Sequence, residues 1–204
     1  MTQPLGIVEI LGLAGSLSLL SGWRLYLCVL ATGLAMRFGA LPLPEHLAAL
    51  QVLANPWVLG VSGVAAAMEL LADKIAWFDS LWDAIHTVVR PLGGALLTLA
   101  VVDPSDPATQ VIAFILGGGG ALLAHGGKAS ARAVVNASPE PFSNVAVSTT
   151  EDVVTGGLLF LAYEFPVVAA VIAALLLAVA IGLLVMARRI LKRLFGRPTN
   201  AAER

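Results

Sequence analysis

The residues of this chain that could do chemistry are concentrated in one short stretch, residues 73–90, DKIAWFDSLWDAIHTVVR. On an ideal helix each residue turns about 100°, so residues spaced by four, three and four lie within an arc of roughly 60°. That spacing gives one helix face the side chains of Asp79, Asp83, His86 and Arg90. Such a face could bind a cation, form ion pairs, or relay protons through the imidazole near neutral pH. The opposite face carries aromatic and aliphatic residues, which predicts an amphipathic helix.

A second polar stripe occurs further along the chain and has the opposite charge bias. Residues spaced by three, four and four, which share an arc of about 80° on a helix, are His125, Lys128, Arg132 and Asn136. Two such helices packed face to face would set the carboxylates of the first stripe against the cations of the second. The sequence therefore predicts a wet, polar centre between them, in which Asp79 and Asp83 pair with Lys128 and Arg132.

The composition places these stripes in a membrane protein. Of the 204 residues, 58% are hydrophobic and only 12% are charged, and the mean hydropathy is +0.90, whereas soluble domains contain about 25% charged residues. Residues 167–187 carry no charge and approach the length of about 20 residues that a spanning helix needs. Ionisable groups at membrane depth cost at least about 2.5–3.5 kcal/mol each. At that depth the stripes must pair, line water or bind a solute.

The elements that position the stripes are all helical. Two apolar pieces, residues 5–20 and 23–38, meet at a break that contains Gly22 and Arg24. They form one kinked helix, two short spans or a re-entrant pair, and a broken helix at membrane depth is tolerated only where it is buried or faces water. Residues 39–56 read as a proline-rich loop with one interfacial helical turn.

We expect an all-α integral membrane protein with about five to seven membrane-embedded helices, some of them broken or re-entrant. Residues 1–190 form a single polytopic domain, and residues 191–204 form a basic tail. A weak internal repeat, of the inverted kind found in transporters, is suggested by a shift of 104 residues, which sets SGWR at 21–24 on HGGK at 125–128. Both positions combine a small-residue helix, a glycine break and a cation.

Other interpretations of the polar segments are open. Residues 73–90 are also typical of a helix in the headgroup layer with solvated carboxylates, and the second stripe could neutralise lipid phosphates. After the prolines at 139 and 141, Ser148 or Thr149 could cap a helix whose first turn holds Glu151 and Asp152, where acids complement the helix dipole. The alternative is a role in the site for Glu140, Asn144 and Glu151.

Several function classes are disfavoured. The net charge of −1 gives no basic field that would attract nucleic acid. The local signatures of serine hydrolases, zinc proteases and nucleotide-binding loops are absent, the single cysteine offers no metal cluster, and we expect no cofactor. If a metal binds at all, hard-cation ligands could come from Glu69, Asp73, Asp79 and Asp83.

Two segments carry a resemblance to a known family: ADKIAWFDSLWDAIHTVVRPLGGAL and HGGKASARAVVNASPEPFSN. They resemble the signature segments of a family of small multi-spanning membrane proteins classed as a domain of unknown function. The resemblance extends over residues 11–183. The family's first segment commonly reads ADKIP, and this chain has Ala76 in place of that proline. The resemblance implies the membrane architecture and the importance of both segments, and it names no substrate.

The leading functional hypothesis is a small channel or transporter for a small ion, a proton or a phosphate-containing anion. Its polar pathway would be lined by Arg24, Glu69, Asp73, Lys74, Asp79, Asp83, His86, Arg90, His125, Lys128, Arg132 and Asn136, with Glu140, Asn144 and Glu151 as further candidates. One alternative is a structural or assembly subunit, whose charges would be fully paired and reached by no cavity. The other is an intramembrane enzyme acting on a lipid or polyprenyl phosphate, which would need a membrane-open groove ending at Asp79, His86 and Lys128.

The expected surroundings follow from the ends and the small residues of the chain. The basic run RRILKRLFGR at 188–197 places the C-terminus in the cytoplasm by the positive-inside rule, and we expect a bacterial inner membrane protein. The N-terminus lacks a basic signal-peptide region, so the first helix is retained. The partners are the lipid bilayer and the solute. The glycine runs at 93–94 and 117–120 allow close helix approach, either inside one chain or in a homodimer.

Overall fold

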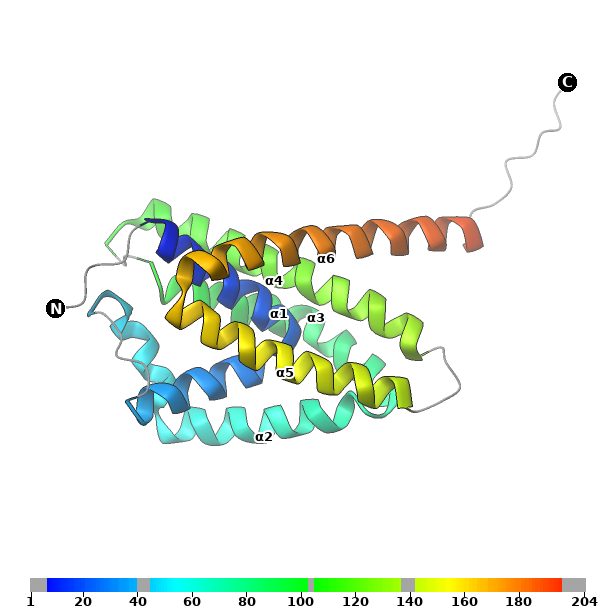
Figure 1. Ribbon diagram of the computed structural model, residues 1–204, viewed down its shortest axis with the longest axis horizontal. Coiled ribbons are helices and arrows are strands. Elements are labelled where there is room, and N and C mark those ends of the chain that lie inside the picture. The colour runs from blue at the N-terminus through cyan, green and yellow to red at the C-terminus, as the bar shows by residue number, and fades with distance from the viewer. Residues whose placement is uncertain (1–6, 40–44, 103–104, 137–141, 196–204) are drawn as a thin grey trace, which may run out of the picture.

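The computed structural model describes residues 7–39, 45–102, 105–136 and 142–195, and the only regular secondary structure in these residues is helical (Figure 1). The elements in chain order are α1 (Ile7–Arg37), a 3-10 helix η1 (Glu45–Ala54), α2 (Pro56–Ala72), α3 (Ala76–Leu99), α4 (Pro107–Asn136), α5 (Phe142–Glu164) and α6 (Pro166–Phe195). The all-α prediction is confirmed, and η1 lies where an interfacial turn was expected.

Four of these helices, α1, α4, α5 and α6, have the length and hydropathy of membrane spans, but α1 is interrupted at Arg24. Helix α2 is apolar but shorter, and α3 is the amphipathic helix that carries the first polar stripe. The protein is thus an all-α membrane bundle. Between α2 and α3 the chain bends at Ile75, which is extended (φ −122°, ψ 105°). The bend forms although Ala76 stands where the family's segment has proline.

Helix α1 folds back on itself at Arg24, whose φ of −142° and ψ of 68° are not helical. The Ser16 hydroxyl donates to the carbonyl of Ala169, at 3.3 Å, and Tyr163 donates to the hydroxyl of Thr32, at 3.2 Å. Ala169 and Tyr163 flank the turn between α5 and α6, whereas a straight helix would separate residues 16 and 32 by about 24 Å. Both halves of α1 therefore lie at the same end of the bundle, with Arg24 at the apex (Figure 1). The re-entrant alternative is confirmed.

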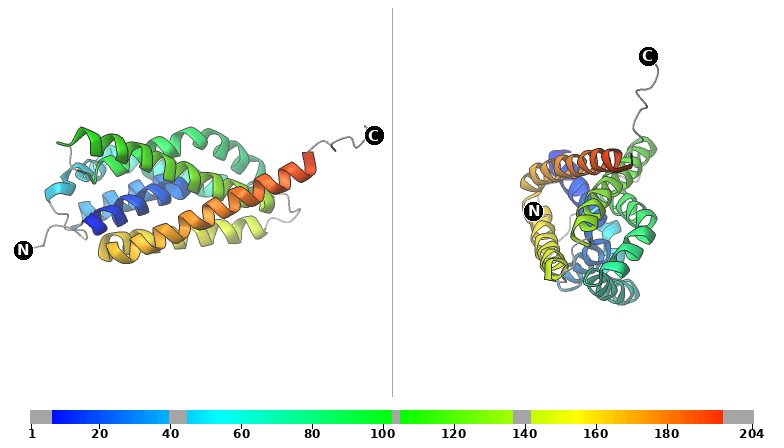
Figure 2. Two further views of the ribbon diagram at one scale, coloured as in Figure 1. Left: turned by 90° about the horizontal axis from the view of Figure 1, so that it is seen from above. Right: turned by 90° about the vertical axis from the view of Figure 1, so that its right-hand side faces the viewer.

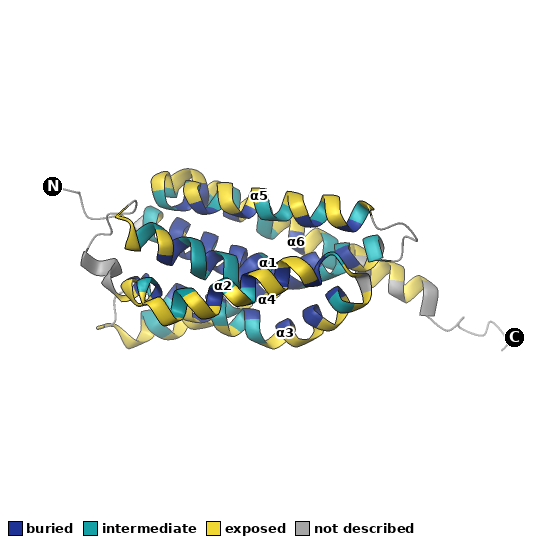
Figure 3. Ribbon diagram, turned by 90° about the horizontal axis from the view of Figure 1, so that it is seen from below, coloured by how far each residue is buried: buried dark blue, intermediate teal, exposed yellow. Residues whose placement is uncertain are grey.

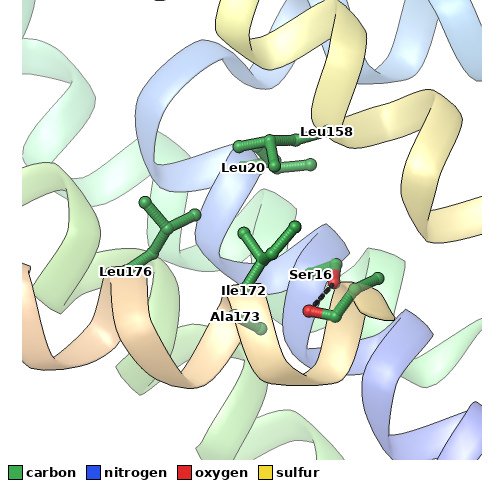
Figure 4. Close-up of a pocket in the computed structure, with 7 residues that line it drawn as sticks. Ser16, Leu20, Leu158, Ile172, Ala173 and Leu176 are labelled. Atoms are coloured by element: carbon green, nitrogen blue, oxygen red, sulfur yellow. Dashed lines mark hydrogen bonds between the residues drawn. The ribbon is translucent and has the colours of Figure 1, made fainter. Parts of the chain in front are cut away.

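The re-entrant helix occupies the centre of the bundle. Helix α1 packs against each of the other five α-helices, and the end-on view shows them arranged around it (Figure 2). Many of its positions are buried (dark blue in Figure 3). They include four leucines of the main hydrophobic core, Leu13, Leu17, Leu20 and Leu25. An apolar cavity of about 10 Å³ lies between α1, α5 and α6, beside the Ser16 hydrogen bond (Figure 4). The first half of α1 is thus fixed by close packing.

Glycines allow α3 and α4 to approach closely and bring the two polar stripes together. A Cβ atom on Gly94 would lie 2.5 Å from the Cβ of Ala121, and one on Gly117 would lie 2.6 Å from the Cβ of Thr98. Such distances are below van der Waals contact, so only glycine fits at these crossings. Among the glycines at 93–94 and 117–120, which were considered for a homodimer, Gly119 is the one at which an added Cβ would have no neighbour within 4 Å. The close approach that these runs permit is therefore intramolecular.

Helix α4 runs unbroken through Gly126 and Gly127, so the break expected there from the sequence echo is wrong. These glycines instead make room for α6, because a Cβ on Gly126 would lie 3.0 Å from Leu184 and one on Gly127 would lie 3.1 Å from the Cα of Ala180. The single glycine at the corresponding place in α1, Gly22, accompanies a real break, whereas the two of α4 serve helix packing. The two halves of the chain do not share a broken helix.

Replacing Gly22 by alanine is expected to destabilise the protein. The new Cβ would meet the carbonyl oxygen of Ala121 and would lie 2.9 Å from the methyl group of Ala124, and both belong to the same neighbouring helix. Overpacking of this kind costs about 1–3 kcal/mol. Thermal unfolding in detergent would measure the loss. The matched control is Gly119→Ala, which meets nothing within 4 Å and should gain about 0.5–1 kcal/mol from helix propensity. Equal melting of both variants would contradict the expected contact.

Candidate functional site

A central ionic network surrounds the apex of α1. It consists of four cationic side chains, six carboxylates and one histidine, contributed by α1, the end of α2, α3, α4 and α5: Arg24, Arg90, Lys128, Arg132, Glu69, Asp73, Asp79, Asp83, Glu151, Asp152 and His125. Nine of these residues are buried, and Glu151 and Asp152 retain side-chain exposures of 14% and 22%. This burial rules out the interpretation of α3 as a headgroup-layer helix with solvated carboxylates.

Arg24 is the hub of the network. Its guanidinium forms ion pairs with Asp73, with Glu151 at 3.3 Å and with Asp152 at 3.0 Å. It also donates to the carbonyl of Ser148, at 3.1 Å. One cation therefore faces three carboxylates from two segments far apart in the sequence.

Lys128 joins α4 to the same centre. Its ammonium lies 3.3 Å from Asp73 and 3.4 Å from Glu151, and it donates to the carbonyl of Trp23, at 3.2 Å. Trp23 immediately precedes the break in α1, where carbonyls lose their helical partners and a cation is favoured by the helix dipole. Burial raises the pKa of Asp73, which lies between α2 and α3, but attraction to Lys128, Arg24 and Arg132 outweighs it, so the pKa is below its usual value. Asp73 is thus held ionised.

The predicted contact between the two stripes is found at Asp79 and Arg132. The Arg132 Nε lies 3.1 Å from Asp79 Oδ2, and the Asn136 amide donates to the same oxygen, at 2.6 Å. Arg132 also donates to the backbone carbonyls of Asp73 and Asn144. Because α3 and α4 run antiparallel, Asp79 near the start of α3 meets the last turns of α4, and later residues of α3 meet earlier residues of α4.

The predicted pairing of Asp83 with a cation of the second stripe was wrong. Asp83 pairs with Arg90 of its own helix, at 3.0 Å, rather than with Lys128, whose ammonium points to the α1 apex. Arg90 also binds Glu69 at 2.6 Å and lies 2.6 Å from Nδ1 of His125. Arginine can only donate, so Nδ1 accepts. Nε2 then carries the proton and donates to the Asp83 carbonyl at 3.1 Å, which makes His125 neutral.

His86 takes part in a separate contact. Its Nδ1 lies 2.7 Å from the Trp82 carbonyl, and because a carbonyl only accepts, Nδ1 donates. Its Nε2 lies 3.0 Å from the hydroxyl of Tyr26 in the second half of α1, and its ring stacks on Trp82 with a centroid distance of 4.4 Å. The structure thus places His86 on the buried side of α3, with partners outside the central ionic network.

Helix α5 contributes more than the sequence predicted. It begins at Phe142, so Glu151 and Asp152 lie in its third turn and the prediction of a cap at Ser148 or Thr149 is wrong. The signal that could have revealed this is the spacing of four, three and four at Asn144, Ser148, Glu151 and Thr155, the same period as in the first stripe.

The remaining predicted residues lie at the edge of the network or outside it. Lys74 is partly buried and donates to the Leu70 carbonyl at 3.2 Å and to Ser148 at 3.5 Å. Glu140 lies outside the described residues. Asp152, Ser148 and Tyr26 take part in the buried polar contacts and were not among the predicted site residues.

Negative charge is in excess in the network. Six carboxylates face four arginine and lysine side chains, and the buried atoms without a hydrogen-bond partner among the described residues include one oxygen each of Glu69, Asp73 and Asp79 as well as nitrogens of Arg24 and Arg90. An unmatched charge in a low-dielectric interior is costly, so such a site takes up protons or binds a cation. The four carboxylates considered for a metal are distributed over three ion-pair groups, and the described part of the chain contains no group of three or more metal-ligating side chains arranged to hold a metal.

A cleft of about 300 Å³ reaches the network between α1, α2 and α5. Its lining consists of Arg24, Leu27, Ala66, Glu69, Leu70, Asp152, Val153 and Gly156. The lipid-enzyme interpretation requires a groove that ends at Asp79, His86 and Lys128. None of these three residues lines this cleft. A larger groove of about 690 Å³ beside α2 and α3 is lined mainly by apolar side chains and touches no member of the network.

Residues 11–186 match the model of a family described as Domain of unknown function (DUF4126). The match spans most of the chain, and the chain belongs to this family, as the two signature segments indicated. Both segments contribute to the network, the first through α3 and the second through α4. Neither a curated protein nor a solved structure matches the chain.

Proposed function

We propose that the protein is a small membrane transporter or channel whose pathway passes through the central ionic network. The observation that carries the proposal is a buried network with more carboxylates than cations that is reached by a cleft at Arg24, Glu69 and Asp152. Ionisable groups inside a membrane protein are expensive and mark ion, proton or substrate paths. A broken helix whose apex lies at such a site is a recurrent feature of transporters.

Two features favour this proposal over the alternatives. A purely structural network would have no cavity at its charges, and the cleft is lined by three of them. An enzyme acting on a lipid phosphate would hold the phosphate with free cations, yet each arginine and lysine of the network already contacts a carboxylate. The excess carboxylates suit a proton or another cation better than an anion.

The roles within the pathway follow from the contacts. Glu69 and Asp152 line the cleft and would receive the solute, while Arg24 and Lys128 hold the neighbouring carboxylates in place. Neutral His125, between Arg90 and the Asp83 carbonyl, could accept a proton once Arg90 moves away from Nδ1. We also propose a bacterial inner membrane with a cytoplasmic C-terminus, supported by the basic side chains in the last turn of α6.

The test is flux into proteoliposomes, with protons, monovalent cations, divalent cations and phosphate offered in turn. The double substitution Asp79→Asn with Lys128→Gln removes one charge of each sign from the network and is expected to abolish the flux. The matched control, Glu164→Gln with Lys192→Gln, makes the same kind of change at exposed positions and should transport like the natural chain. Absence of flux for every solute from well-folded protein would refute the proposal and favour the structural subunit.

A further inference from the structure

The cleft between α2 and α5 combines an apolar wall with a charged floor. Its wall is made by aliphatic residues and glycine, namely Leu27, Ala66, Leu70, Val153 and Gly156. Leu70, Val153 and Gly156 are exposed on the flank of the bundle. In a membrane bundle this flank faces lipid, so the cleft is accessible to molecules dissolved in the bilayer.

The floor of the cleft carries an unsatisfied acceptor. Glu69 is 1% exposed, its Oε1 accepts from Arg90 at 2.6 Å, and its Oε2 is buried without a hydrogen-bond partner among the described residues. A buried acceptor left in this state is energetically costly. Oε2 is covered in this structure, so a donor that enters the cleft would satisfy it after the Glu69 carboxylate turns toward the cleft.

The charge around this acceptor is negative. Arg24, the cation that lines the cleft, is shared by Asp73, Glu151 and Asp152, and Arg90 is shared by Glu69 and Asp83. Neither guanidinium has charge to spare for an anion. The floor is complementary to a cationic donor, and the wall is complementary to a hydrocarbon group.

We propose that the cleft binds a small amphipathic organic cation, an amine with a short apolar group, with its ammonium on Glu69 and its apolar part between α2 and α5. The volume of about 300 Å³ lies at the lower end of the range of small-molecule sites, which excludes a whole phospholipid. The inference deepens the proposed function and rests on it by naming the class of solute that the pathway receives.

The test is binding, measured on the full chain in lipid nanodiscs with three probes of equal chain length: hexylammonium, hexanoate and hexan-1-ol. Hexylammonium is expected to bind and to raise the thermal unfolding midpoint, whereas hexanoate and hexan-1-ol should bind at least about tenfold more weakly, the factor that a charge-assisted hydrogen bond provides. Equal affinity for all three probes would mean that the cleft only accommodates hydrocarbon, and the proposal would be wrong.

Two pairs of variants locate the site. Gly156→Leu fills the cleft at a position where a Cβ meets nothing within 4 Å, and Gly157→Leu makes the same change on the neighbouring residue, which does not line the cleft. Glu69→Gln removes the acceptor charge, and Glu164→Gln removes an exposed one. Hexylammonium affinity should fall at least about tenfold in Gly156→Leu and Glu69→Gln and persist in the two controls. Loss in all four variants, or in none, would overturn the assignment.

Binding and flux separate this inference from the proposed function. If hexylammonium binds at Glu69 but no solute is transported, the binding site is supported and the proposed transport pathway is refuted. If protons or inorganic cations are transported but hexylammonium does not bind, the transport pathway is supported and the organic cation is refuted as its solute.

Discussion

Replacing Arg24 by methionine is expected to destabilise the protein more than any other single substitution of a charged residue. The change keeps a long side chain but leaves Asp73, Glu151 and Asp152 without the guanidinium that contacts all three. Removing one partner of a buried ion pair costs about 3–5 kcal/mol, and here it leaves Asp152 without its ion pair and Lys128 alone between Asp73 and Glu151. The measurement is the free energy of unfolding in detergent micelles, followed by helical circular dichroism.

The control for this experiment is Arg37→Met, the same exchange at the exposed end of α1, where the arginine donates only to the carbonyl of Ala54. It should change the free energy of unfolding by no more than about 0.5 kcal/mol. Adding Asp73→Asn to Arg24→Met should recover part of the loss, since one buried charge fewer is then unmatched and the two effects are coupled. An Arg24→Met protein as stable as the natural chain would show that the network does not stabilise the apex.

The second large effect is expected at Arg90, where stability and transport can be separated. Arg90→Met alone leaves Glu69 and Asp83 buried without their shared cation and should cost about 3–5 kcal/mol. Replacing all three charges by apolar residues, as in Glu69→Met with Asp83→Leu and Arg90→Met, should restore most of this loss, because a well-packed apolar set often equals a buried ion pair in stability.

Transport in this triple variant distinguishes the two main functional interpretations. A pathway through the network predicts a folded protein with no flux in the proteoliposome assay. A structural network predicts that the triple variant behaves like the natural chain in every assay. A variant that folds and still transports at the natural rate would therefore remove Glu69 and Asp83 from the pathway.

Much of the site could be predicted from sequence because helical spacing alone decides which side chains share a face. The two stripes on α3 and α4 were identified in this way, and their contact at Asp79 and Arg132 was predicted from their opposite charge. The break in α1 was likewise visible in the glycine and arginine at 22 and 24, although three geometries remained open there. These predictions rested on the helical spacing of the polar residues and on the residue types at the break in α1.

The rest of the site depends on information that local spacing does not contain. Which cation meets Asp83 depends on where Lys128 points, and its ammonium lies at the Trp23 carbonyl and Asp73, which leaves Asp83 to Arg90 of its own helix. The contribution of α5 depends on where that helix begins, and the polar run before Glu151 was interpreted as the end of a loop rather than as two further helical turns. The direction in which Lys128 points and the start of α5 were therefore the two sources of error.

The apex of α1 has a consequence for how the protein is made. Arg24 is synthesised early, but of its carboxylate partners only Asp73 comes soon after it, and Glu151 and Asp152 appear only when α5 has emerged. Until then a re-entrant segment with an arginine at its tip is poorly accommodated in lipid. The nascent α1 must therefore be shielded by the insertion machinery or wait at the membrane surface. We therefore expect α1 to close into the centre of the bundle only after the helices that pack against it have been translated.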